Sequence, residues 1–297
     1  MWQPPRGAVL VGVDGSAAAL GAVRWAARDA ALHRVPLVLV HVIDAALPEW
    51  FEVAALTDFG QRQQRRARDF VESAIKVAEE STDGHGPVHI ESKVLASAPI
   101  PTLVGLSAQA AMVVVGYRRR DALARSVLGS VSSALVYHAH CPVAVIHDRE
   151  ARGAAVARAP VLVGIDGSTA SEAATAIAFQ EASRRGVDLV ALHAWIEPWA
   201  SGSGRFQNAH WDAQLSEQEA TLAERLAGWQ DRHPEVTIRR RLEIGDPASC
   251  LIDASEQAQL IVVGSHGSGR LRGALLGSVG AAVVSSAKIP VIVARRW

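Results

Sequence analysis

The stretch VLVGVDGS at residues 9–16 recurs almost unchanged as VLVGIDGS at residues 161–168. Three further segments recur in the same order and at nearly the same distance along the chain: LVLVHVI (37–43) as LVALHAW (189–195), MVVVG (112–116) as LIVVG (260–264), and VLGSVS (127–132) as LLGSVG (275–280). Self-similarity that keeps its order and spacing indicates repeated structural units. The sequence therefore predicts two tandem domains, residues 1–148 and 160–297, joined by an Arg- and Ala-rich linker over 149–159.

Length and composition support a globular protein with two domains. The 297 residues suit about two domains of ordinary size, and a hydrophobic content of 49% provides for sizeable cores. The 30 Lys and Arg side chains balance 30 Asp and Glu, which argues against a globally basic nucleic-acid-binding protein. Two cysteines cannot form a disulfide framework, and we expect both Cys141 and Cys250 to be buried thiols.

No segment of the sequence predicts export or membrane insertion. The N-terminal residues MWQPPRGAVLVGVDG lack a basic segment followed by an apolar one, so we expect no secretory signal and a cytoplasmic location. Residues 94–117 carry no charge, but Pro99 and Pro101 interrupt them, and the strongest apolar run is confined to 111–116. We therefore expect a short helix that leads into a buried strand rather than a membrane span.

Hydrophobic patterning alternates between strands and helices in each half. Each half opens with a continuous apolar run rich in β-branched residues, which is typical of strands covered on both faces of a parallel sheet. The expected strands are 8–13, 36–43, 88–94, 112–116 and 142–147, then 161–165, 187–195, 236–242, 260–264 and 290–294. The longer expected helices are 17–33, 58–81, 169–185 and 208–233. This alternation predicts an α/β fold in which each half forms a five-stranded parallel sheet with helices on both faces.

The loop after the expected fourth strand of the second half holds the most informative motif, G-x2-G-x9-G-S, formed by Gly264, Gly267, Gly277 and Ser278. Parallel α/β sheets bind ligands beyond the carboxyl ends of their strands, where this loop is expected to lie. Glycines let backbone N–H groups approach an anion, and the N-terminus of the following helix favours a phosphate. The motif predicts a phosphate cradle, although an ordinary strand-to-helix loop with a serine N-cap would show the same spacing.

Taken together, the two D-G-S turns, the HVI and HAW strand ends, GDPA from Gly245 and the glycine loop resemble the universal stress protein family in its tandem actinobacterial form. The resemblance covers nearly the whole chain, twice. It implies a Rossmann-like domain in each half and an ATP site, with adenine near the first two strands and phosphates in the glycine loop. It also implies a regulatory role in the stress response, in which Mg²⁺ can accompany the ATP.

Carried onto this sequence residue by residue, the resemblance implies a nearly intact site in the second half. Asp166 would accept hydrogen bonds from the ribose hydroxyls, Gly164 would lie beneath the nucleoside, and the backbone of Ala194 would meet the adenine edge. The residues expected to hold or flank the phosphates are Val263, Gly264, Gly267, Ser268, Gly269, Arg270, Gly277, Ser278 and Val279. Asp166 could instead serve only the turn before the helix, as Asp14 could in the first half.

The first half keeps most of that set and departs from it at one position. The equivalent positions hold Gly12, Asp14, Val42, Gly116, Gly129 and Ser130. Position 119, where the motif has glycine, is arginine. The Cβ and long side chain of Arg119 could block close approach of the backbone, or the arginines at 118–120 and 125 could bind phosphate directly. We predict strong nucleotide binding in the second half and weak or no binding in the first.

The remaining polar and aromatic candidates have simpler interpretations. His41 and His193 end apolar strands, so we expect them to pack or hydrogen-bond in the core, and we expect no catalytic role for His266. Four tryptophans near the second strands could cover the adenine side, or could pack in the core or in an interface: Trp50, Trp195, Trp199 and Trp211.

We expect ligand binding without efficient turnover, because no paired carboxylates and no nucleophile–base set accompany the glycine loop. Two alternatives remain open, a slow ATPase or phosphoryl transferase and a nucleotide-independent interaction module. The apolar fifth strands would otherwise be exposed sheet edges, so we expect a homodimer or pairing of these strands within one chain. A regulatory protein partner is also expected.

Overall fold

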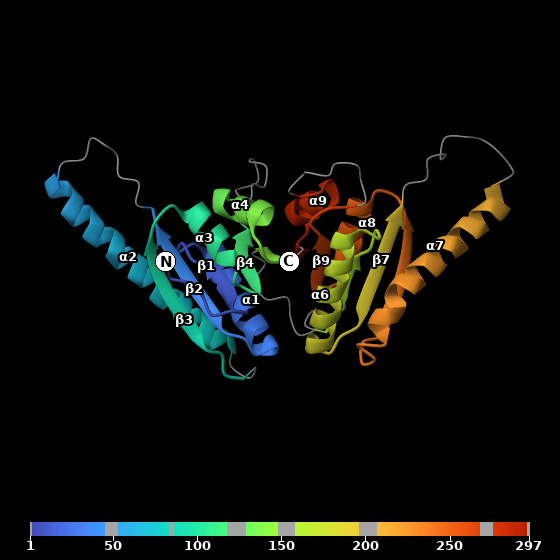
Figure 1. Cartoon of the computed structure of the whole chain (residues 1–297), viewed down its shortest axis with the longest axis horizontal. Helices are drawn as coiled ribbons and strands as arrows, with labels where there is room; N and C mark the ends of the chain where they lie inside the picture. Colours follow the sequence, from blue (N-terminus) through green and yellow to red (C-terminus); the bar gives the residue numbers. More distant parts are fainter. Residues whose placement is uncertain are drawn as a thin grey trace. The chain divides into compact units, whose positions relative to one another are not determined.

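The computed structural model describes residues 2–44, 53–82, 86–117, 129–147, 158–195, 207–267 and 276–295, and gives side chains for all of these except 53–59 and 207–214. The chain forms two compact units, the first up to residue 148 and the second from 149 to 295 (Figure 1). Each unit has a sheet and a set of helices of its own.

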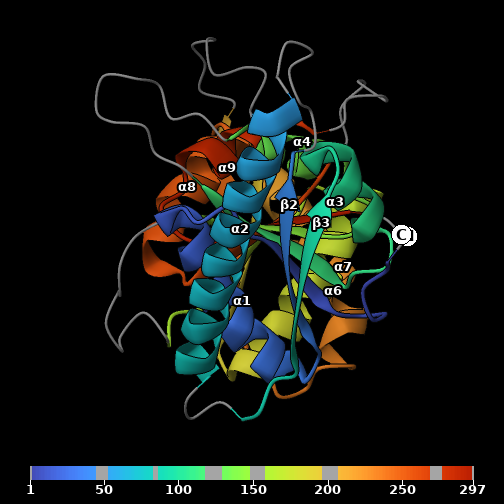
Figure 2. The ribbon, with the colours of Figure 1, turned by 90° about the vertical axis from the view of Figure 1, so that its left-hand side faces the viewer.

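The sheet of the first unit contains β1 (Val9–Gly12), β2 (Leu37–Ile43), β3 (Ile90–Ala96), β4 (Met112–Tyr117) and β5 (Val143–His147). Its strands lie in the order β3-β2-β1-β4-β5, and all neighbours are parallel. The connecting helices are α1 (Ala17–His33), α2 (Val53–Thr82), α3 (Pro99–Ser107) and α4 (Ser130–His138). Helix α1 packs against α2 and α3 packs against α4, and Figure 2 shows α2 and α3 on opposite sides of β2 and β3.

The second unit repeats this arrangement. Its strands are β6 (Val161–Gly164), β7 (Leu189–Trp195), β8 (Ile238–Ile244), β9 (Leu260–Gly264) and β10 (Val291–Ala294), in the parallel order β8-β7-β6-β9-β10. Its helices are α6 (Thr169–Arg185), α7 (Gln207–Gln230), α8 (Pro247–Ala254) and α9 (Ser278–Ser286), with a short 3-10 turn at Ser255–Gln257. The expected α/β fold, with a five-stranded parallel sheet in each half, is confirmed.

The D-G-S turn determines where the first helix of each unit begins. In the second unit, Asp166 Oδ1 accepts a 2.9 Å hydrogen bond from the Ser168 N–H. Gly167 between them has φ +78°, a conformation that favours glycine. Ser168 then caps α6, because its Oγ accepts a 3.1 Å hydrogen bond from the Ser171 N–H. The first unit uses the same turn at residues 14–16 to begin α1.

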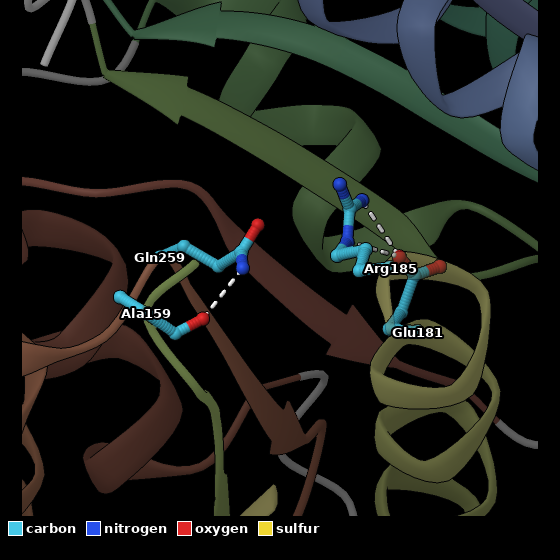
Figure 3. A network of polar contacts seen from close by, with 4 residues as sticks. All are labelled: Ala159, Glu181, Arg185 and Gln259. Carbon is cyan, nitrogen blue, oxygen red and sulfur yellow. Dashed lines mark hydrogen bonds and ion pairs between the residues drawn. The ribbon is translucent and has the colours of Figure 1, made fainter. Parts of the chain in front are cut away.

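Polar contacts of the second unit fix the beginnings of its two central strands (Figure 3). The side-chain amide of Gln259, just before β9, donates a 2.5 Å hydrogen bond to the carbonyl of Ala159, just before β6. The backbone N–H of Gln259 donates a 3.0 Å hydrogen bond to the Pro160 carbonyl. Gln259 therefore fixes the start of β9 relative to the start of β6. This sets how far the carboxyl end of one strand is offset from that of the other. Figure 3 also shows the ion pair of Arg185 and Glu181, one turn apart on α6 at 2.7 Å.

Several expected boundaries were wrong by a few residues. The third strand of each unit begins two residues later than expected, at Ile90 and Ile238. In the first unit, all seven residues of β3 pair with β2, from Leu37–Ile90 to Ile43–Ala96, so pairing rather than local apolarity sets its ends. In the second unit, Val236 belongs to the preceding turn, where its N–H donates to the His233 carbonyl at 3.1 Å.

The two cysteines differ in environment. Cys141 is buried as expected, but the expectation for Cys250 was wrong, since it is only partly buried. Cys250 lies on α8 beside the buried face formed by Ala248 and Leu251. Desolvation, with a smaller contribution from the charge of Glu243, raises the pKa of its thiol. Among the described helices, none is long and apolar enough to cross a membrane.

Candidate functional site

A cavity of about 530 Å³ lies in the second unit where the strand order reverses, at the carboxyl ends of β6 and β9. Neighbouring crossovers leave opposite faces of the sheet at this point, which opens a crevice suited to ligands. The cavity brings together nine of the residues that the sequence proposed for a ligand site: Gly164, Asp166, Ala194, Val263, Gly264, Gly267, Gly277, Ser278 and Val279. The other three, Ser268, Gly269 and Arg270, lie outside the described residues.

Bare backbone forms one side of this cavity. A Cβ added at Gly264 would lie 2.9 Å from the carbonyl carbon of Ala170, in the first turn of α6. A Cβ at Gly164 would lie 3.0 Å from the Leu251 side chain of α8. A side chain at position 264 would therefore collide with the backbone of α6, whereas one at position 164 would only require the end of the Leu251 side chain to shift.

The loop that follows β9 is tied to its neighbours by backbone groups. The Gly277 N–H donates a 2.7 Å hydrogen bond to the Ser265 carbonyl, which joins the end of β9 to the start of α9. The hydroxyl of Ser168 donates to the His266 carbonyl at 3.3 Å, which joins the same loop to the D-G-S turn. These bonds bring the turn that carries Asp166 next to the glycine motif.

The N-terminus of α9 opens into this cavity without a side-chain cap. Gly277 is its N-cap, and within the described residues no side chain accepts a hydrogen bond from the first turn. By contrast, α6 and α8 are capped by Ser168 and Asp246. Uncapped N–H groups together with the positive end of the helix dipole form an anion-binding site.

Asp166 brings a carboxylate to the edge of the anion-binding backbone. Its Oδ1 serves the turn, as described above, so the simpler interpretation of this residue is correct for that oxygen. Its Oδ2 lies on the side of the glycine motif, since a Cβ added at Gly267 would be 3.0 Å from it. The backbone N–H of Asp166 donates to the Ser171 hydroxyl at 3.2 Å, which fixes the residue from its main chain. One side chain therefore serves the turn and lines the cavity.

Residues of β7 and α8 complete the lining of the cavity. His193 and Trp195 line it from β7, and Pro247 and Leu251 line it from α8. The His193 Nδ1 hydrogen-bonds to the Ile165 carbonyl at 2.6 Å, as expected, although the residue is only partly buried and is among those that line the cavity. His266 lines the cavity as well, and its Nδ1 lies 3.0 Å from the Ser265 hydroxyl.

Sequence reasoning missed part of this lining. It assigned His193 to the core and left Trp195 undecided, although both belong to the end of β7 at a spacing of two and so share one face of the strand. Pro247 belongs to the GDPA segment, whereas Leu251 lies one turn further along α8 and gave no signal. Of the other tryptophans considered, Trp50 and Trp199 lie outside the described residues, as does the side chain of Trp211.

The first unit has a cavity of about 500 Å³ at the equivalent place. All six residues proposed for this half line it: Gly12, Asp14, Val42, Gly116, Gly129 and Ser130. The arginines at 118–120 and 125 lie outside the described residues. Gly129 caps α4 without a side-chain hydrogen bond among the described residues, as Gly277 does for α9. The backbone of the site is thus duplicated with the fold.

Comparison with known proteins agrees with this duplication. The sequence model of the universal stress protein family matches residues 6–147 and again residues 158–295. The chain is 48% identical over 287 residues to universal stress protein Rv2623 of Mycobacterium tuberculosis H37Rv, covering 97% of this chain and 96% of that protein. It is 46% identical over 287 residues to a universal stress protein of Mycolicibacterium smegmatis, with the same coverage of both chains.

Solved structures show the same fold. A universal stress protein from Archaeoglobus fulgidus superposes with a TM-score of 0.70 at 19% identity, over 98% of both chains. The protein PA1789 from Pseudomonas aeruginosa superposes with a TM-score of 0.60 at 17% identity, over 97% of this chain and 92% of that one. With one family match in each unit and close relatives along its whole length, this chain belongs to the universal stress protein family.

Proposed function

We propose that the second unit binds ATP and that the protein acts as a nucleotide-dependent regulator rather than as an efficient enzyme. The observation that carries this proposal is the convergence, in one cavity, of an uncapped helix N-terminus, glycine backbone and a carboxylate. Each of these groups suits a different part of a nucleotide, and the fold brings all three to one edge of the sheet.

The phosphates fit the glycine-rich side of the cavity. Backbone N–H groups at the start of α9 offer donors and a positive partial charge to an anion. A side chain at position 267 would fill space between the glycine loop and Asp166, since its Cβ would lie 3.0 Å from Asp166 Oδ2. Mg²⁺ would enter with the triphosphate and be carried chiefly by its oxygens, as this cation prefers.

The nucleoside fits the other side. Asp166 offers a carboxylate acceptor of the kind that ribose hydroxyls bind, next to the glycine motif. The end of β7 and the start of α8 supply a largely apolar lining for the base. A volume of about 530 Å³ lies within the range of small-molecule sites, about 300–1,000 Å³.

The chemistry of the lining favours binding over turnover. Among the described residues that line this cavity, Asp166 is the single carboxylate, and none is a lysine. Phosphoryl transfer typically relies on carboxylates that hold metal ions, a lysine and a positioned base. We infer that bound ATP biases the protein between states that a partner, or a second copy of the chain, distinguishes.

The test is calorimetric titration of the full chain with Mg-ATP, alongside Asp166→Ala and the matched variant Asp14→Ala. We expect one tight site per chain, lost in Asp166→Ala and retained in Asp14→Ala, with circular dichroism confirming that both variants fold. A chain that shows no affinity for adenine nucleotides at millimolar concentration would refute the proposal. A single-turnover hydrolysis assay distinguishes a binding protein from an ATPase.

A further inference from the structure

β8 is an edge strand of the sheet of the second unit. It pairs in parallel with β7 along its whole length, from Ile238 to Ile244, and no described strand lies along its other side. An edge strand presents unpaired backbone N–H and C=O groups, with which a further strand can pair. The backbone and the side chains of β8 therefore decide what this edge accepts.

Alternate backbone groups of β8 and its flanking residues face away from β7. The carbonyl of Thr237 accepts a 2.9 Å hydrogen bond from the Leu189 N–H. At the other end, the Gly245 N–H donates a 3.0 Å hydrogen bond to the Trp195 carbonyl, so the odd-numbered positions bond to β7. Because the direction alternates from one residue to the next along a strand, the backbone groups of residues 238, 240, 242 and 244 face the open edge.

Three consecutive exposed arginines occupy the middle of this edge. Arg239 and Arg241 lie on one face of the strand and Arg240 lies on the other. Arg239 pairs with Asp188 at 2.5 Å. Arg241 pairs with Glu243, also at 2.5 Å. Exposed ion pairs of this kind contribute little to stability, so another carboxylate can replace either partner at low cost. Among the described residues, no carboxylate forms an ion pair with Arg240.

Apolar side chains follow the arginines toward the carboxyl end of the strand. Leu242 is partly buried, and Ile244 is 49% exposed, which is unusual for a large apolar side chain. Because side chains alternate along a strand, both lie on the same face as Arg240. One face of the edge thus offers a cation followed by two apolar groups, and the other face offers two cations.

The equivalent edge strand of the first unit carries a different set of charges. In β3, Glu91, Ser92 and Lys93 stand where β8 has its three arginines. The Nζ atom of Lys93 lies 5.6 Å from the centroid of the Trp2 ring, in a cation–π contact. Charged side chains, lysine above all, commonly protect sheet edges, whereas a guanidinium binds a carboxylate through two parallel hydrogen bonds. The edge of the second unit is therefore better suited to bind carboxylates.

We propose that β8 docks a partner protein through an extended acidic segment, which adds to the sheet antiparallel to β8. Three acidic side chains of the segment lie opposite the arginines, and two apolar side chains lie opposite Leu242 and Ile244. Backbone pairing supplies affinity and the side chains supply specificity, as in other cases of strand addition. Antiparallel pairing is favoured because it is slightly more stable per residue and often completes the edge of a parallel sheet.

Charge favours this partner over a second copy of the chain. β8 holds three arginines and one glutamate, so two copies paired through β8 would face each other with an excess of positive charge. β3 of another copy offers Glu91 together with Lys93, and so no net negative charge. A segment with consecutive acidic residues complements the edge better than either strand. The inference does not depend on nucleotide binding, because β8 contributes no residue to the described lining of the cavity.

The experiment measures the binding of a fluorescein-labelled peptide to the full chain by fluorescence anisotropy. The peptide is Val-Thr-Val-Glu-Glu-Glu with capped ends, which in the antiparallel direction sets its valines opposite Ile244 and Leu242 and its glutamates opposite the arginines. Arg240→Ala should weaken binding about tenfold, as the loss of a charge-assisted hydrogen bond does. The matched control is Lys93→Ala, which removes a cation from the edge strand of the first unit and should leave the affinity unchanged. Circular dichroism confirms that both variants fold.

Hydrogen exchange followed by NMR gives a second readout, which tests the backbone pairing itself. The peptide should slow the exchange of the amide hydrogens of residues 240, 242 and 244, which face the open edge. The amide hydrogens of residues 239, 241 and 243 already bond to β7 and should exchange as before. A peptide of the same composition in another order, Val-Glu-Thr-Glu-Val-Glu, should bind more weakly because it places its glutamates on one face only.

Four results would overturn the proposal. They are a wild type that does not bind the first peptide, equal binding of the two peptides, equal affinity of wild type and Arg240→Ala, and unchanged exchange at the three outward amides. Tighter binding of single-stranded oligothymidylate, lost in Arg240→Ala, would assign the edge to a nucleic acid instead. An oligomer of the wild type that dissociates in Arg240→Ala would assign it to a second copy of the chain.

Discussion

The two units enclose cavities of similar volume, about 530 and 500 Å³, but they line them differently. In the second unit, Gly280 leaves the first turn of α9 without a side chain, and a Cβ there would lie 3.3 Å from the Gly264 carbonyl oxygen. In the first unit, Ser132 holds this position, and its hydroxyl donates to the Gly116 carbonyl at 3.2 Å. The backbone thus fixes where a site lies, and a few side chains decide what can occupy it.

A second difference lies behind the D-G-S turns. A Cβ at Gly167 would lie 2.3 Å from the guanidinium of Arg225, whereas one at Gly15 would lie 2.2 Å from the ring of Phe70. The long helix of each unit therefore covers the turn closely, in one unit with a cation and in the other with an apolar ring. In the first unit the nearest guanidinium is one layer further out, since that of Arg66 lies over the Phe70 ring, 5.7 Å from its centroid.

The largest effect is expected where helix and strand approach most closely. Gly116→Ala would place a Cβ 2.2 Å from the Ala18 carbonyl oxygen, so we expect a loss of about 3 kcal/mol in the free energy of unfolding. Gly264→Ala has more room, with 2.9 Å to the nearest atom, and should cost about 1–2 kcal/mol. Urea denaturation measures both changes.

Gly105→Ala is the control for these variants, because its Cβ would meet no atom within 4 Å and it lies inside α3. It should stabilise the protein slightly, by up to about 1 kcal/mol. If Gly116→Ala and Gly264→Ala lowered the free energy of unfolding equally, the closer helix–strand contact at Gly116 would not be what determines the cost of an added Cβ.

The next effect concerns the motif itself. Gly267→Val would place a branched side chain against Asp166 Oδ2, 3.0 Å from the added Cβ. We expect it to weaken ATP binding roughly 100-fold, as the loss of one or two charge-assisted hydrogen bonds would. In the first half, Arg119→Gly restores the motif and should raise the number of sites per chain in calorimetry. Unchanged stoichiometry would show that Arg119 is not what separates the two halves.

The smallest effect concerns helix caps. Asp246 caps α8, where its Oδ2 accepts 2.9 Å hydrogen bonds from the backbone N–H and the hydroxyl of Ser249, whereas Ala98 begins α3 without a side-chain cap. The hydrogen bonds from Ser249 lower the pKa of Asp246 below its usual 3.8. A carboxyl group whose pKa is lower in the folded state than in the unfolded state stabilises the fold at any pH above the unfolded-state pKa. This stabilisation is lost as the pH falls through the folded-state pKa.

Asp246→Ala should therefore lower Tm at pH 7, and the difference from wild type should shrink below about pH 4. Ala98→Asp should raise the stability of the first unit by about 1 kcal/mol. Thermal unfolding followed by circular dichroism between pH 3 and 7 measures both. A Tm difference for Asp246→Ala that stays constant down to pH 3 would contradict a role for the ionised cap.

Much of the fold could be predicted because local patterns and tertiary structure agree. Apolar β-branched runs marked the central strands, and the D-G-S turns marked the starts of α1 and α6 to the residue. The predicted positions of the edge strands β3 and β8 were wrong by two residues. The ends of these strands depend on pairing with a neighbouring strand, which local apolarity does not reveal.

The candidate site was predictable where it depends on backbone and not where it depends on side chains from distant segments. Glycines in a regularly spaced motif indicate where the backbone lies close to a neighbour or a ligand, so Gly264 and Gly277 could be identified from the sequence. Trp195 and Leu251 carry no such signal, since a tryptophan or a leucine at a strand end or on a helix is usually core. Their meeting in one cavity follows from the strand order.

The turn formed by Asp166, Gly167 and Ser168 ties recognition to folding. The carboxylate that holds the turn before α6 is the same group that borders the cavity, so a substitution of Asp166 would change the turn together with the proposed ligand contact. We expect a conservative substitution in this turn to lower the free energy of unfolding before it changes ligand specificity. A position such as 280, where the first unit holds Ser132, can change without disturbing the start of α6.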